Sequence, residues 1–295
     1  MPQHDTIRKR RRTIALSLGF GILFAAYLTV GLLVIHTKAP DEQTFTPRSN
    51  LSGRPLDVYA ELLSVNAVRD AVDLRLDFAT DRDRLGVRFG VPADRDMVVE
   101  IGDGDSEQQV TWHRGQRMAT LPLSFDLSTG NVEDYPFDRY TATLTVTAYE
   151  GTDAASGIPL PLQMTVWKRL PAWDIATTAT QLQANPAAVA LTFAIRRAPL
   201  PIVFATTIYC AMAVMAIISL STGSLLFLRI RRMDTTMAAV LAAMIFTLPG
   251  LRGLMPGDPP LGVHGDHLVF FWAEISVVIG LALTVAAWAI GGDDR

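Results

Sequence analysis

Three charged residues near the carboxyl end of the chain stand within or beside long apolar stretches. Glu274 lies about 10 Å, by helix rise, inside the last apolar block, and Arg252 and Asp266 bracket the loop before it. A carboxylate at that depth in a membrane is costly unless it is neutral, hydrated or paired. Two kinds of chemistry fit. One is a clamp that holds two helices together, an ion pair in which Arg252 is the obvious partner of Glu274. Asp266 is the other candidate partner of Glu274, and the second kind of chemistry is a proton path through Glu274 and Arg252. The clamp is favoured, because proton carriers usually contain a chain of such groups.

A second group of polar residues surrounds a turn in the middle of the chain, Asp134-Tyr135-Pro136-Phe137-Asp138. Proline fixes its φ at about −65° and so places the aromatic rings on either side on a defined surface. The carboxylates of Asp134 and Asp138 can accept backbone amides or pair with arginine. On physical grounds alone, the segment is interpreted as a hairpin entry whose aromatic side chains belong to a core.

The remaining polar residues form no pattern typical of catalysis or metal binding. Asp103-Gly104-Asp105 lacks the further oxygen ligands of a calcium loop, and His113 and His264 are isolated. Phosphate-binding glycine loops, serine elbows and histidine–glutamate metal motifs are absent from the sequence. We therefore expect a protein that is not an enzyme, with no catalytic residues, metal or cofactor. The net charge of −3 gives no reason to expect nucleic acid as a partner.

The composition is typical of a membrane protein. Of 295 residues, 49% are hydrophobic and 19% are charged, whereas an average soluble domain has about 25% charged residues. The apolar residues gather in four blocks, which excludes a soluble enzyme, a disordered chain and a secreted disulfide scaffold. Cys210 is the sole cysteine, so no internal disulfide can form.

The four apolar blocks predict four transmembrane helices. The first, residues 13–36, follows the basic cluster Arg8-Lys9-Arg10-Arg11-Arg12, which remains cytoplasmic. It is longer than the apolar region of a cleaved signal peptide, so we interpret it as a signal anchor. The positive-inside rule then places both termini in the cytoplasm and residues 37–197 outside, in a multi-pass protein of the cell membrane.

In the segment between the first two blocks, apolar residues recur with a period of two. Apolar and polar residues alternate from Val72 to Phe78 and from Thr141 to Ala148. Short alternating segments separated by turns predict an all-β antiparallel sandwich. The predicted organisation, by residue number, is 1–12 basic tail, 13–36 anchor, 37–55 tether, 56–197 sandwich, 198–228 second transmembrane helix, 229–234 cytoplasmic loop, 235–254 third transmembrane helix, 255–266 outer loop, 267–291 fourth transmembrane helix and 292–295 cytoplasmic tail.

Two of these motifs resemble those of the pentameric ligand-gated ion channels. Tyr135-Pro136-Phe137-Asp138, which leads into an alternating strand, resembles their signature turn, and Arg196-Arg197 resembles their junction with the membrane. The resemblance implies that Asp138 lies near the membrane and pairs with Arg196 or Arg197. It also implies that the turn presses on the outer loop between Arg252 and Asp266, which makes the turn and both arginines a domain–membrane interface.

The whole chain is more similar to an uncharacterised bacterial membrane family, domain of unknown function 4436. The similarity lies in the layout of anchor, sandwich and three further helices, and in the segment Tyr135-Pro136-Phe137-Asp138-Arg139-Tyr140. It extends to the carboxyl-terminal pattern that runs from Leu248-Pro249 to Phe270-Phe271-Trp272-Ala273-Glu274. The resemblance implies the architecture and carries no assigned activity.

Three functions fit these features. The first is a binding or scaffold protein that rests on the lipid bilayer and presents the sandwich to an envelope component, another membrane protein or a second copy. The alternatives are a channel-like oligomer gated through the Tyr135–Asp138 turn, and a carrier that uses Arg252 and Glu274. The third apolar block has no polar stripe for a pore, and the sequence offers no second intramembrane carboxylate, so the binding protein is favoured.

Overall fold

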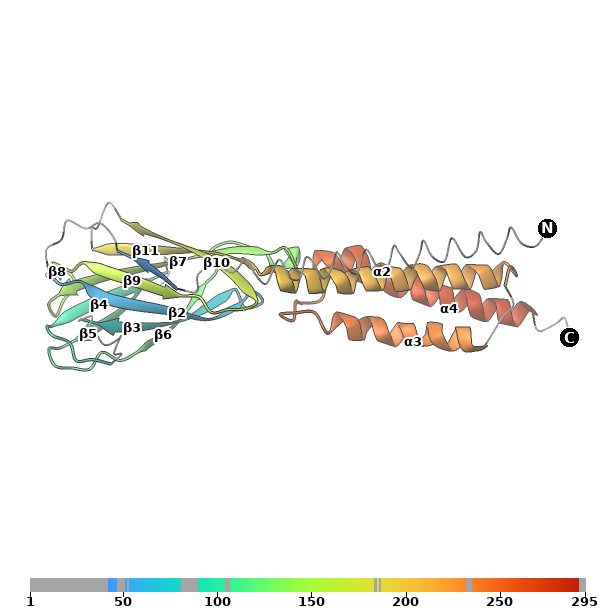
Figure 1. Ribbon diagram of the computed structural model, residues 1–295, viewed down its shortest axis with the longest axis horizontal. Coiled ribbons are helices and arrows are strands. Elements are labelled where there is room, and N and C mark those ends of the chain that lie inside the picture. The colour runs from blue at the N-terminus through green and yellow to red at the C-terminus, as the bar shows by residue number, and fades with distance from the viewer. Residues whose placement is uncertain are drawn as a thin grey trace, which may run out of the picture. The chain divides into compact units, whose positions relative to one another are not determined.

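The computed structural model describes residues 42–46, 51, 53–80, 90–103, 107–182, 185, 187–231 and 235–291 (Figure 1). These residues form two β-sheets followed by helices. The predicted basic tail, the anchor over residues 13–36 and the tail over 292–295 lie outside the described residues.

The strands form two sheets. The order in the first sheet is β1 (Glu42–Phe45), β9 (Leu162–Trp167), β2 (Leu56–Asn66), β3 (Ala71–Ala79) and β6 (Leu121–Asp126). The order in the second is β10 (Trp173–Gln181), β11 (Ala188–Arg197), β7 (Arg139–Glu150), β4 (Met97–Gly102) and β5 (Glu107–Trp112), and β8 (Ile158–Pro159) pairs with β7. Neighbouring strands are antiparallel, except that β2 and β9 run parallel.

The two sheets pack face to face over a common core. Alternate residues of β3 and of β7 are buried, as their period of two predicts. Aromatic rings join the sheets, with centroids 4.8 Å apart for Phe78 and Trp112 and 6.1 Å apart for Phe125 and Phe193. The β-sandwich of the predicted fold is therefore present, with one parallel pair in place of a wholly antiparallel arrangement.

Besides the two-residue strand β8, two strands lie where the sequence indicated none. β1 falls inside the predicted tether over residues 37–55 and forms an edge strand against β9. β10 is rich in threonine and alanine, so its alternation does not stand out in the sequence. Both are edge strands, which have less apolar surface to bury than central strands do.

Helices α2 (Pro199–Phe227), α3 (Thr235–Arg252) and α4 (Phe271–Gly291) follow the sandwich, and a π-helical turn, η2 (Asp266–Phe270), leads into α4 (Figure 1). Along α2, Tyr209 contacts Asp266 and Ser219 contacts Val277. Because partners advance in the same direction on both helices, α2 and α4 run parallel. α3, which lies between them in the sequence, must therefore run in the opposite direction.

The prediction of four transmembrane helices is wrong. In the part of the chain that the structure describes, two helices are long and apolar enough to cross a membrane, α2 and the helix over Asp266–Ile290. α3 is a shorter apolar helix, because Pro249 lies inside its last turn and Arg252 ends it, which leaves the predicted block 235–254 incomplete. The predicted anchor lies outside the described residues.

The helices expose large apolar side chains along their whole length. Exposed positions include Val214 and Ile217 on α2, Phe246 on α3, and Trp272 and Trp288 on α4, and the side chain of Phe246 is 82% exposed. Soluble proteins rarely expose apolar surface this extended, and patches of this kind mark membrane or protein contacts. The two long apolar helices thus indicate association with a membrane.

Glycine brings α2 and α4 into close contact. A methyl group added at Gly223 would overlap the backbone of Gly280, and one added at Gly280 would overlap Ser219. Gly250 on α3, in contrast, has no atom within 4 Å of the position that a methyl group would take. Small residues that let helix backbones approach in this way are typical of helix pairs in membranes.

We expect Gly280→Ala to lower the melting temperature of the detergent-solubilised protein, because α2 and α4 must separate to admit the methyl group. Gly250→Ala is the matched control. It should leave the melting temperature unchanged or raise it, since alanine favours a helix over glycine by about 0.5–1 kcal/mol. Equal effects of the two substitutions would show that the helices do not pack through these glycines.

Candidate functional site

Arg197 occupies the junction between the sandwich and the helices. β11 ends at Arg197 and α2 begins at Pro199, so a single residue, Ala198, separates them. Alternate residues of a strand face opposite sides. Arg197 therefore shares the buried side of β11 with Phe193, while Arg196 faces outward.

The guanidinium of Arg197 is enclosed by groups from several segments. Its Nε donates to Oδ1 of Asp138 at 2.6 Å, and the two side chains are 3% and 0% exposed. Its central carbon lies 4.5 Å from the ring centroid of Tyr135 and 4.7 Å from that of Trp173. Its Nη1 donates to the carbonyl of Pro256 in the loop between α3 and α4, at 3.3 Å. The result is a buried ion pair held between two aromatic faces.

Two tyrosines complete this pocket. The hydroxyl of Tyr140 donates to the second oxygen of Asp138 at 2.9 Å, and burial together with the Asp138 carboxylate raises the pKa of Tyr140. Burial raises the pKa of Tyr135 to about 12. Both phenols therefore remain protonated at neutral pH. The ring of Tyr135 packs in an apolar cluster with helix residues such as Tyr209, and its hydroxyl is buried without a hydrogen-bond partner among the described residues.

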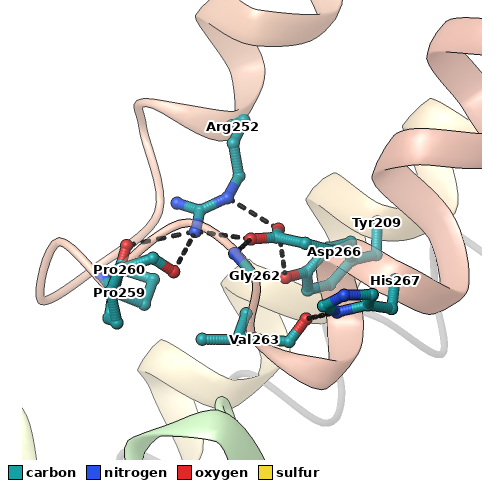
Figure 2. Close-up of polar contacts among 8 residues, drawn as sticks. All are labelled: Tyr209, Arg252, Pro259, Pro260, Gly262, Val263, Asp266 and His267. Atoms are coloured by element: carbon teal, nitrogen blue, oxygen red, sulfur yellow. Dashed lines mark hydrogen bonds and ion pairs between the residues drawn. The ribbon is translucent and has the colours of Figure 1, made fainter.

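A second buried ion pair joins the ends of the helices that lie near the sandwich (Figure 2). Nε of Arg252 donates to Oδ1 of Asp266 at 2.7 Å, and Nη2 donates to Oδ2 at 2.8 Å. Nη2 also donates to the carbonyls of Pro259 and Pro260, at 3.1 and 2.9 Å. The bidentate geometry and the extra acceptors offset the cost of burying the charge.

Asp266 receives two further hydrogen bonds from other segments. The hydroxyl of Tyr209 on α2 donates to Oδ1 at 3.2 Å, and the backbone N–H of Gly262 donates to Oδ2 at 3.0 Å (Figure 2). Each carboxylate oxygen thus accepts two hydrogen bonds. Such a network fixes α2, α3 and α4 to one another, and it is suited to holding the helix ends together rather than to moving a proton.

The loop between α3 and α4 connects the two ion pairs. Gly257 adopts a φ of +82°, and a methyl group there would overlap the guanidinium of Arg197. Glycine at this position therefore allows both the left-handed turn and the close approach. Nδ1 of His264 lies 3.3 Å from Oδ1 of Asp134, which also joins the same loop to the turn that precedes β7.

The structure brings some of the predicted interface residues together and separates others. Tyr135, Asp138 and Arg197 meet at the junction, whereas Phe137, in the same turn, is 65% exposed. Arg196 lies on the other face of β11, where it pairs with Asp174 at 2.6 Å.

In the predicted intramembrane group, Arg252 pairs with Asp266. Within the described part of the chain, Oε2 of Glu274 is buried without a hydrogen-bond partner. The predicted pairing of Glu274 with Arg252 is therefore not found.

Two aromatic residues of the junction were not predicted as site residues. Trp173 lies directly opposite Arg197 in the register of β10 and β11, and Tyr209 reaches Asp266 from α2. A signal for Tyr209 was present, because a phenol inside an apolar block needs a polar partner when buried. No comparable signal existed for Trp173, since the strand it begins was not predicted.

We expect Arg197→Gln to lower the free energy of unfolding by about 3–5 kcal/mol, because it leaves the Asp138 carboxylate buried without its countercharge. Arg196→Gln, one residue away, removes an exposed ion pair and should cost at most about 1 kcal/mol. Denaturation of the detergent-solubilised protein, followed by tryptophan fluorescence, measures both. Similar losses in the two variants would contradict the assignment of Arg197 as the buried partner.

Two family models match the chain. Domain of unknown function DUF4436 matches residues 46–193, and domain of unknown function DUF8686 matches residues 197–291. Asp138 lies in the first match and Arg197 in the second, so the buried ion pair joins the two. No match is found among curated proteins. Neither model is that of the pentameric ligand-gated channels, and that resemblance stays a prediction. Since its model spans half of the sequence, including every strand except β1 and the last four residues of β11, the chain belongs to the DUF4436 family.

Proposed function

We propose that the protein is an integral membrane protein that presents its β-sandwich as a binding or scaffold domain in a fixed orientation on the bilayer. The observation that carries this proposal is the burial of Arg197 between the sandwich and the loop of the helices. With Ala198 as the sole residue between β11 and α2, and with this ion pair beside it, the sandwich has no flexible linker.

The parallel course of α2 and α4 supports a multi-pass arrangement. If both helices cross the bilayer in the same direction, α3 must cross it in the other. Arg229 and Arg231, at the end of α2 far from the sandwich, favour that end as cytoplasmic and the sandwich as extracytoplasmic.

The end of the sandwich opposite Arg197 is the surface free to bind a partner. Ile158 pairs with the last residue of β7 and is 68% exposed, and Leu182 follows β10 at the same end. The junction end, in contrast, is covered by the loop between α3 and α4. We propose another membrane or envelope protein, or a second copy of the chain, as the partner of this free end.

A photo-crosslinking amino acid placed at Ile158 should yield a discrete protein adduct in intact cells, because this position is exposed on the free end. The same amino acid at Trp288, which is comparably exposed on α4, should label lipid and give no protein adduct. Adducts are resolved by electrophoresis and identified by mass spectrometry. A binding role would be contradicted if neither Ile158 nor Leu182 gave an adduct.

A specific observation favours a carrier as the second candidate. Arg252 pairs with Asp266 and not with Glu274, and one oxygen of Glu274 is buried without a hydrogen-bond partner in the part of the chain that the structure describes. An unpaired carboxyl group inside a membrane helix is an expected site for a bound proton.

If Glu274 holds a proton, dicyclohexylcarbodiimide should modify it, because this reagent attacks protonated carboxyl groups in apolar surroundings. Asp266 is the matched control. It accepts four hydrogen bonds, two of them from Arg252, and should remain unmodified. Mass spectrometry of wild-type and Glu274→Gln membranes locates the adduct. Unmodified Glu274, or equal modification of both residues, would exclude the carrier.

A further inference from the structure

In the Asp134–Asp138 turn, Phe137 differs from its neighbours in its exposure. Tyr135 and Asp138 are buried, yet the aromatic ring of Phe137 between them is exposed. The backbone N–H of Phe137 donates to the carbonyl of Asp134 at 2.9 Å, and the Asp138 carboxylate is held by Arg197. These contacts fix the backbone on both sides of Phe137, so its ring is held in an outward-facing position.

Phe137 also lies at a defined level relative to the helices, near the start of α2. Its neighbour Asp138 contacts Arg197, and α2 begins two residues after Arg197. Leu200, in the first turn of α2, is an exposed apolar residue, as is Leu268 in the π-helical turn before α4. Phe137 thus lies where the apolar outer surface of the helices begins.

The loop between α3 and α4 brings further apolar side chains to this level. Leu254 and Leu261 are both exposed. The loop is tied to the sandwich by the contact of His264 with Asp134 and by the hydrogen bond from Arg197 to the Pro256 carbonyl. Phe137, Leu254 and Leu261, which we call the apolar rim, therefore come from two separate segments that meet at the junction.

We infer that the apolar rim is a lipid-binding surface that inserts into the interface of the bilayer and seats the sandwich on it. Leu200 at the start of α2 and Leu268 before α4 are exposed near the same junction, so one occupant that surrounds all these elements fits better than a compact protein partner. Aromatic side chains favour the level of the lipid headgroups. The inference rests on the proposed membrane insertion of the helices, and it adds that the sandwich itself contacts lipid.

Spin labels on the full chain test the inference. Cys210 is replaced by alanine, and single cysteines are introduced at Phe137, Leu261, Ile158 or Phe246 in protein reconstituted into liposomes of phosphatidylcholine and phosphatidylglycerol. Ile158 matches Phe137 in exposure, at 68% against 65%, but lies at the far end of the sandwich. Phe246 on α3 reports whether the helices are inserted. Variants that keep the melting temperature of the Cys210→Ala protein are compared by collision with oxygen and with a water-soluble nickel chelate.

The expected result is a several-fold lower collision rate with the nickel chelate at Phe137 and Leu261 than at Ile158, together with retained collision with oxygen. Leu261 tests the rim from a second segment if the Phe137 variant fails to fold. A label at Phe137 that behaves like the one at Ile158, while Phe246 is inaccessible to nickel, would overturn the inference and leave the membrane proposal standing. Protection of Phe137 from both reagents would indicate a protein contact and also overturn it. Nickel collision at Phe246 would contradict membrane insertion itself.

Discussion

The junction depends on one arginine that water does not reach. Removing a guanidinium and a carboxylate from water costs several kcal/mol for each ion, and close contacts with further partners must offset that cost. Arg197 has such partners in Asp138 at 2.6 Å, in two aromatic rings and in a loop carbonyl. They belong to the turn before β7, the start of β10 and the loop between α3 and α4. These segments cannot move independently without leaving a buried charge unpaired.

The second ion pair extends this constraint to the helices. Arg252 donates to the carbonyls of two consecutive prolines, residues that offer acceptors but no N–H of their own. Asp266 in turn accepts hydrogen bonds from α2, α3 and the loop, so the ends of three helices are held together beside the sandwich. A displacement of the sandwich would therefore act on all three helix ends together, as the proposed scaffold of fixed orientation requires.

Much of this architecture could be predicted from local patterns, because strand alternation and apolar blocks are visible in the sequence itself. The buried strands β3 and β7 follow from their period of two, and the block after Arg197 predicts α2. The extent of α3 was overestimated, since the block was measured by hydropathy and not by the proline and arginine at its end. The partner of Arg252 depends on three-dimensional detail. In η2 the N–H of Phe271 bonds to the carbonyl of Asp266, and this wider turn shifts every later residue around the helix in a way that spacing does not reveal.

The buried ion pair also shows that the boundary between the two family matches differs from the boundary of the folded sandwich. As units of sequence, the two family matches divide the chain between residues 193 and 197, and Arg197 falls with the helices. As a unit of folding, the sandwich extends through Arg197, because that residue neutralises Asp138 inside the sandwich and is the last residue of β11. A sandwich cut out along the sequence boundary would carry an uncompensated carboxylate in its interior. The two modules thus share a buried ion pair, so an unrelated module in the place of either would have to supply the matching charge.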